Sequence, residues 1–105
     1  MNRISFKTGE NRVLGFVLSG HCTTDEQDEN GKLVCSAVSS AAYMTANTIT
    51  DVIGARADIT LDDAYLSMYI LDKIAECQPI LNGFRLHMMG LAEQYKNEIE
   101  VISEV

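Results

Sequence analysis

The chain has 105 residues, of which 47% are hydrophobic and 22% are charged, with one proline and seven glycines. These values predict a single globular domain over residues 1–105 and exclude an intrinsically disordered chain. No apolar run approaches the roughly 20 residues that cross a bilayer, and the N-terminus lacks the apolar core of a signal peptide. We therefore expect a cytoplasmic protein with no membrane contact.

The net charge of −7 at neutral pH restricts the choice of partner. Proteins that bind the phosphates of nucleic acid need an excess of Lys and Arg. Direct nucleic-acid binding is therefore disfavoured for this acidic chain. An acidic protein suits a basic protein partner, because long-range attraction accelerates their encounter. Simple solubility explains the same charge equally well.

Two strands are predicted at the start of the chain. Residues 2–7 alternate, with Ile4 and Phe6 on one face, and residues 8–11 have the composition of a turn. Residues 12–19 form the second strand, which carries apolar side chains on both faces. This pattern favours a central strand or an interface.

Residues 22–32 contain four carboxylates and no apolar periodicity, which predicts a surface loop. A plain connection between strand and helix is one interpretation. A loop of this length in so compact a domain is more often functional. We expect it to open for a substrate and to close over it.

The run that follows Cys35 has no Gly or Pro before residue 54, and its apolar residues recur at helical spacing. We expect this helix to stop near Asp51, with Gly54 as its terminating residue. Cys35 is thereby predicted in the first helical turn, where the helix dipole lowers a thiol pKa towards neutrality.

The same helix start supplies candidate groups around Cys35. The backbone amides of Ser36 and Ala37 are candidates for holding a developing oxyanion. Ser39 lies one turn after Cys35 and is a candidate hydrogen-bond donor. Packing of a small residue explains Ser39 at least as well.

His21 is the natural partner of Cys35. It follows the second strand directly, and Gly20 allows the backbone to turn sharply before the imidazole. If the strand end lies beside the helix start, imidazole and thiol can form an ion pair. The alternative interpretation is a buried thiol and an exposed loop histidine.

A second hairpin is predicted from residues 56–61 and 64–71, around Asp62 and Asp63. Tyr65 and Tyr69 share one face of its second strand, which suits a peptide contact, a dimer contact or an ordinary sheet surface. From residue 72 the period becomes helical, and residues 98–105 have the aliphatic content of a short final strand.

The remaining cysteine and histidine lie on that last helix. Cys77 belongs to its apolar stripe and is expected to pack in the core, and His87 is expected on its surface. A catalytic His87 is the competing assignment, although no accompanying motif supports it.

The predicted order is strand-strand-helix-strand-strand-helix with a short C-terminal strand. This order indicates a small α+β domain with a mostly antiparallel sheet. Two helices leave part of such a sheet uncovered, so a homodimer is expected.

Three cysteines without CxxC spacing predict reduced thiols rather than a disulfide framework. A metal site built from Cys22, Cys35, His21 and His87 is disfavoured, because adjacent His21 and Cys22 have poor chelate spacing. We expect no metal and no cofactor. Cys22 is interpreted as a loop residue without a role.

The pattern around the candidate pair is more specific than either residue alone. It comprises Gly20-His21, a loop with Gly31 near its end, Leu33-Val34-Cys35, Ser36-Ala37 and Ser39. This pattern closely resembles the ribosomal-processing cysteine protease (Prp) family. The likeness extends through the length of about a hundred residues, the two leading strands, the small-residue helix and a last helix ending like residues 91–98.

The resemblance implies a cysteine endopeptidase in which Cys35 is the nucleophile and His21 its general base. The family removes a short N-terminal extension from the twenty-seventh protein of the large bacterial ribosomal subunit, so a ribosomal protein precursor is the implied substrate. Family substrates carry a short apolar and aromatic segment before the cut, which implies an apolar groove beside Cys35. The resemblance also implies a homodimer.

One departure concerns the third catalytic member. The family often has Asp shortly before the aliphatic-Cys step, where this chain has Lys32, so that role cannot be carried over. Asp25, Glu26 and Asp28 are the candidates for orienting His21.

Two rival functions follow from the same residues. One is a noncatalytic ribosome-associated binding module, which Lys32 supports and the retention of His21 and Cys35 opposes. The other is a thiol redox sensor, for which a cysteine at a helix start also serves.

Overall fold

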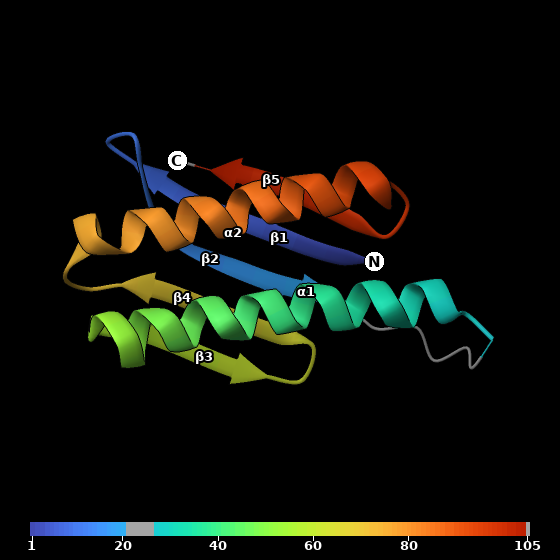
Figure 1. Ribbon diagram of the computed structural model, residues 1–105, viewed down its shortest axis with the longest axis horizontal. Helices are drawn as coiled ribbons and strands as arrows, with labels where there is room; N and C mark the ends of the chain where they lie inside the picture. Colours follow the sequence, from blue (N-terminus) through green and yellow to red (C-terminus); the bar gives the residue numbers. More distant parts are fainter. Residues whose placement is uncertain (21–26, 105) are drawn as a thin grey trace.

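The computed structural model describes residues 1–20 and 27–104. The elements are β1 (Asn2–Gly9), β2 (Arg12–Gly20), α1 (Glu29–Asn47), η1 (Thr48–Ile53), β3 (Ala57–Asp62), β4 (Tyr65–Ile70), α2 (Ile74–Gln94) and β5 (Ile99–Glu104) (Figure 1). The predicted order of strands and helices is confirmed, including the final strand. Among the described residues, neither long helix is apolar enough to span a membrane.

The strands form one mixed sheet in the order β3-β4-β2-β1-β5. All pairs are antiparallel except β1 with β5, which run parallel. The expectation of a mostly antiparallel sheet is therefore confirmed. β2 is the third of the five strands, so the prediction of a central strand is confirmed.

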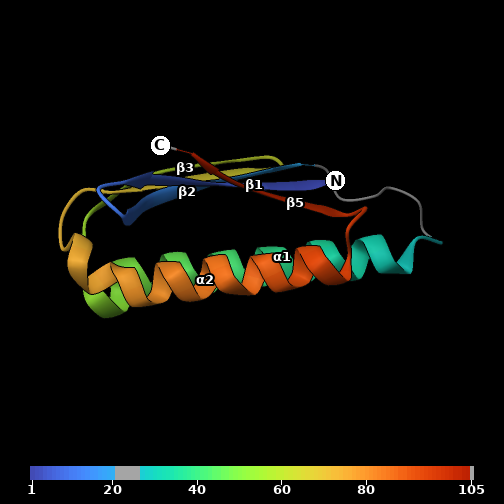
Figure 2. The same cartoon turned by 90° about the horizontal axis from the view of Figure 1, so that it is seen from above.

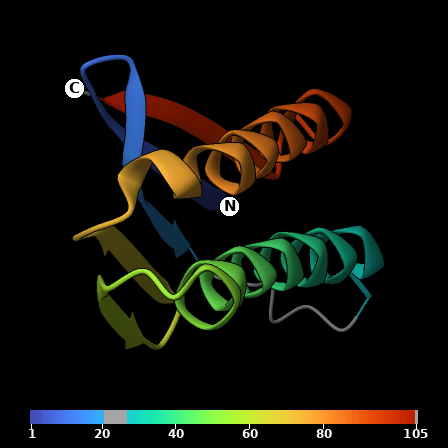
Figure 3. The same cartoon turned by 60° about the vertical axis from the view of Figure 1, so that its left-hand side comes forward.

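Both long helices cover the same face of the sheet, where they lie side by side in opposite directions (Figures 2 and 3). The core fills the space between the helices and the sheet. The α2 stripe buries Cys77, Leu81, Phe84 and Met88, as its helical period predicts. Tyr65 and Tyr69 alternate with the buried residues of β4 and are 39% and 40% exposed.

The start of α1 differs from the prediction. The helix begins at Glu29, so the last residues assigned to the loop are its first turn. The side chain of Asp28 caps it by accepting a hydrogen bond from the Gly31 amide at 2.9 Å, and Glu29 adds a favourable charge near the positive end of the helix dipole. These contributions offset the roughly 1 kcal/mol by which Gly31 disfavours a helix.

The far end of this helical segment follows the prediction more closely. After Asn47 the chain continues as the π-helical turn η1, which ends at Ile53 and is capped by Gly54. Gly54 has a φ of 78° in the left-handed region. It therefore acts as the predicted terminating residue.

Candidate active site

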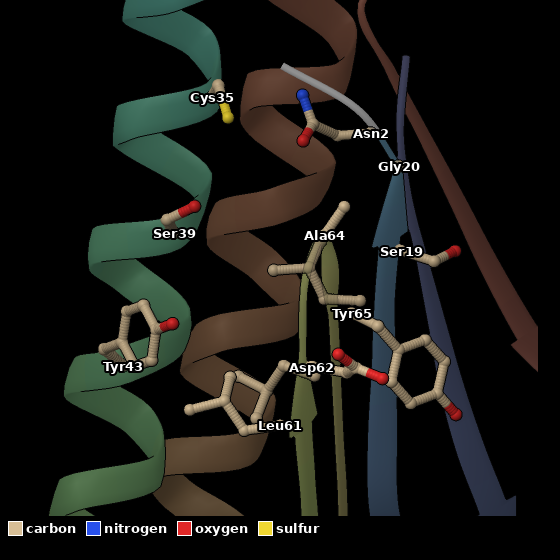
Figure 4. Close-up of a pocket in the computed structure, with 12 residues that line it drawn as sticks. Asn2, Ser19, Gly20, Cys35, Ser39, Tyr43, Leu61, Asp62, Ala64 and Tyr65 are labelled. Atoms are coloured by element: carbon tan, nitrogen blue, oxygen red, sulfur yellow. The ribbon is translucent and has the colours of Figure 1, made fainter.

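A cavity of about 180 Å³ opens between α1 and the edge of the sheet formed by β3 and β4 (Figure 4). Its walls come from four segments: the start of β1, the end of β2, the stretch of α1 from Cys35 to Tyr43, and the adjoining ends of β3 and β4 with their turn. Figure 1 shows that the three sheet segments lie at the same end of the sheet. It is lined by Asn2, Leu18, Ser19, Gly20, Cys35, Ser39, Tyr43, Leu61, Asp62, Ala64, Tyr65 and Leu66.

Cys35 lies at one end of this cavity and is 8% exposed. Ser39 and Tyr43 follow it at successive turns of α1 and line the same cavity, because residues four apart share a helix face (Figure 4). Ser39 is thus found beside Cys35, as the sequence predicted. Tyr43 was not predicted, although the same spacing of four could have indicated it.

The redox state of Cys35 differs from the prediction. Its sulfur is part of a disulfide in the structure, whereas reduced thiols were expected. Attack on a carbonyl requires the thiolate, so the disulfide must be reduced before Cys35 can act as a nucleophile.

The prediction that Cys35 occupies the first turn of its helix is wrong. Cys35 lies more than one turn after Glu29, where the effect of the helix dipole has weakened. At this depth the amides of Ser36 and Ala37 donate to the carbonyls of the preceding turn. The predicted oxyanion role of these two amides therefore loses its basis.

Gly20 brings the end of β2 into the wall that contains Cys35. Its φ is 137°, a conformation that side chains disfavour, and a Cβ atom there would lie 2.1 Å from the Met1 carbonyl oxygen. His21 follows directly but lies outside the described residues, as do residues 22–26 of the predicted loop, which include Cys22, Asp25 and Glu26. Asp28 is described, and its carboxylate caps α1.

Substituting Gly20 with alanine tests how much this strand end matters. We expect Gly20→Ala to lower the free energy of unfolding by about 1–3 kcal/mol, because the new Cβ both clashes and strains the backbone. Gly90→Ala is the matched control, since nothing lies within 4 Å of its Cβ position on α2. That control should instead raise stability by about 1 kcal/mol. Urea titration of both variants distinguishes these results, and equal stability of the two would contradict the account.

Cys77 and His87 lie away from this cavity. Cys77 is fully buried as predicted, and desolvation raises the pKa of its thiol. It is therefore a poorly reactive thiol at neutral pH. His87 lies on α2 and lines a separate hollow with Leu86 and Gly90, so the structure does not bring it into the Cys35 cavity.

Asn2 and Leu61 belong to the site but were not identified from the sequence. Both lie far from Cys35 in the sequence, one at the start of β1 and the other near the end of β3. Only the pairing of β1 with β2 and of β3 with β4 brings them to the cavity. No short-range pattern carries this information.

Residues 1–100 match the family model described as cysteine protease Prp. The chain belongs to the Prp family of cysteine proteases. No curated protein matches the sequence. Membership of the family confirms the resemblance seen in the motif around Cys35, and it makes the protein a cysteine protease by class.

Solved structures show the same fold. The Prp protease of S. aureus, with a covalently linked product peptide, is 21% identical with a TM-score of 0.86, and the match covers 99% of this chain and 100% of that one. The same protease with a substrate peptide gives 20% identity, a TM-score of 0.86 and the same coverage. SMU.848 from Streptococcus mutans is 19% identical with a TM-score of 0.82, covering 99% and 96%.

Proposed function

We propose that this Prp family member removes the short N-terminal extension from the twenty-seventh protein of the large bacterial ribosomal subunit, with Cys35 as nucleophile and His21 as general base. One observation carries the proposal. Cys35 and Gly20, the residue before His21, line the same cavity beside an apolar wall. The similar S. aureus protein is a ribosomal processing protease, which agrees with this substrate.

The proposed reaction is peptide hydrolysis by acyl transfer. His21 accepts the thiol proton, and the Cys35 thiolate forms a bond to the scissile carbonyl carbon while the π electron pair moves to oxygen. When this pair returns, the C–N bond breaks and His21 gives its proton to the leaving amine. Water then attacks the thioester, and the carboxylic acid product leaves with the thiol restored.

The cavity fits an apolar side chain of the substrate. Leu18, Leu61, Leu66 and the ring of Tyr43 supply its apolar surface. Cavities of about 150 Å³ with aliphatic walls hold benzene, so about 180 Å³ accommodates an aromatic ring. We infer that this cavity receives a side chain of the apolar and aromatic segment that family substrates carry before the cut.

A charge placed on the cavity wall tests this assignment. Leu61 is 61% exposed, so its side chain stabilises the fold little but faces the substrate. We expect Leu61→Asp to raise KM for the precursor peptide about tenfold, because it replaces apolar contact with a carboxylate that must be desolvated. Steady-state cleavage kinetics measure the change.

Ile59→Asp is the matched control for this prediction. Ile59 precedes Leu61 by two residues on β3, shares its sheet face and is 42% exposed, but it does not line the cavity. Its KM should stay within about twofold of wild type. An equal rise in KM for both variants would show that general charge on β3, not the cavity wall, controls substrate binding.

The disulfide at Cys35 gives the redox-sensor alternative its one supporting observation. Treatment with a reductant, followed by an assay for peptide cleavage, distinguishes the two functions. A protease gains peptide turnover when dithiothreitol reduces Cys35. A sensor instead reacts rapidly with dilute peroxide and turns over no peptide.

The proposal also includes a cytoplasmic location and a homodimer. Tyr65 and Tyr69 alternate along β4 with the buried core residues Leu66 and Met68, so they belong to its other face, and they are partly exposed. Figure 2 shows both helices on one side of the sheet and no described element on the other. Aromatic residues are enriched at protein interfaces. Sedimentation equilibrium tests the dimer.

The function itself is tested with a synthetic peptide that carries the extension and the first residues of the mature ribosomal protein. Wild-type protein under reducing conditions should cut it once, at the junction, as mass spectrometry of the products shows. A scrambled peptide of the same composition is the control. Binding of the junction peptide without a cut would identify a binding module instead, and equal cutting of both peptides would contradict the proposed substrate.

A further inference from the structure

We propose that the side-chain amide of Asn2 stabilises the oxyanion during attack by Cys35. The inference rests on the proposed function and adds a catalytic residue to it. The need for such a residue follows from the position of Cys35 in α1. Because the helix begins at Glu29, the amides after Cys35 donate within the helix and cannot also serve the substrate. Another donor must face the reacting carbonyl.

Asn2 lies where such a donor is needed. It alternates with Ile4 and Phe6 on the face of β1 that the helices cover, so its side chain points towards α1 rather than to solvent. Asn2 and Cys35 line the same cavity, and Figure 4 shows the carboxamide of Asn2 pointing towards Cys35 from the opposite wall.

The amide of Asn2 is buried but only weakly engaged. The residue is 7% exposed, and its only side-chain hydrogen bond within the described part of the chain is from Nδ2 to the Glu98 carbonyl, at 3.5 Å. That carbonyl already accepts the Asn2 backbone amide at 2.9 Å. A length of 3.5 Å is at the limit for an N–H···O bond. At least one N–H of Nδ2 is therefore available to a ligand in the cavity.

This arrangement suits transition-state stabilisation. When the Cys35 sulfur bonds to the carbonyl carbon, the π electron pair moves to oxygen, which becomes the strongest acceptor in the cavity. A preorganised amide donor binds this oxyanion more tightly than the neutral carbonyl of the substrate. The Asn2 amide should thus lower the barrier for acylation and leave substrate binding nearly unchanged.

The test compares Asn2→Leu and Asn2→Asp with wild type in cleavage of the junction peptide. Both variants keep a side chain of similar size but lose the amide donor. We expect kcat to fall on the order of 10²-fold with KM within about twofold, as for loss of one oxyanion donor. Affinity for a peptide aldehyde, which forms an oxyanion-like adduct with the thiol, should fall by a similar factor. Asn82→Leu, which removes an exposed carboxamide on α2, should change neither.

Two further measurements separate catalysis from structure. Alkylation by iodoacetamide involves no oxyanion, so the alkylation rate of reduced Cys35, followed by peptide mapping, should stay unchanged in Asn2→Leu. The thermal midpoint of this variant should not fall, because leucine replaces a buried and poorly paired amide.

The results of these measurements either support or overturn the oxyanion role of Asn2. Wild-type kcat in both Asn2 variants would overturn it while leaving the proposed function intact. A kcat loss accompanied by an equal loss of alkylation rate, or by a lower melting temperature, would make Asn2 a structural residue and also overturn it. Failure of the wild-type protein to cut the peptide would instead refute the proposed function, and the inference with it.

Discussion

Replacing Cys35 with alanine is expected to reduce kcat/KM for the junction peptide by a factor of about 10⁴ or more. Removal of a nucleophile from a hydrolase abolishes the covalent route and leaves only the smaller effects of binding and oxyanion stabilisation. The peptide should still bind, because the apolar wall of the cavity comes from other residues. Cleavage kinetics under reducing conditions, with peptide binding measured separately, check both parts of this expectation.

Cys77→Ala is the control for the loss of a thiol. Cys77 is fully buried in α2 and does not line the cavity, and burial raises the pKa of its thiol. Its substitution should leave kcat/KM within about twofold and cost about 1 kcal/mol of stability through the lost packing. If Cys35→Ala kept more than a tenth of the wild-type activity, Cys35 would not be the nucleophile.

The largest expected effect on stability comes from Phe16→Ala. Phe16 is fully buried on the central strand β2, and its ring centroid lies 4.9 Å from that of Phe84 and 6.4 Å from that of Phe6. The rings of Phe6 and Phe16 on the sheet thus pack against that of Phe84 on α2. Truncation should lower the free energy of unfolding by about 3–5 kcal/mol, from lost burial and the cavity left behind.

Leu86→Ala is the matched control on the opposite side of α2. Leu86 is 72% exposed, so its truncation should change stability by no more than about 0.5 kcal/mol. Chemical denaturation measures the free energy of unfolding of both variants, and equal m-values would show that the difference is one of stability alone. A loss below about 1 kcal/mol for Phe16→Ala would show that the three rings are not the centre of the core.

The features that could be predicted from the sequence are those that depend on local periodicity. Alternation in residues 2–7 and the helical stripe through Phe84 indicate how each segment packs, and the structure agrees. The start of α1 was mispredicted because Gly31 was interpreted as a loop residue. The cap from Asp28 stabilises a helix there in spite of this glycine.

The site was predictable only in part, for a related reason. Cys35 and Ser39 were found because they belong to one motif and one helix face. Asn2 and Leu61 reach the cavity through strand pairing over long sequence separations, which a single sequence does not encode in any local pattern. The candidate nucleophile could therefore be proposed from the sequence, whereas most of the walls that surround it could not be predicted.

In the proposed reaction Cys35 forms a covalent bond with the substrate carbonyl carbon. The most direct measurement is intact-mass spectrometry of wild-type protein, reduced beforehand, mixed with the junction peptide and quenched in acid before one turnover is complete. The mass should increase by that of the acyl group of the N-terminal product, and peptide mapping should locate this group on Cys35. Cleavage without any adduct, or an adduct on another residue, would contradict the proposed reaction.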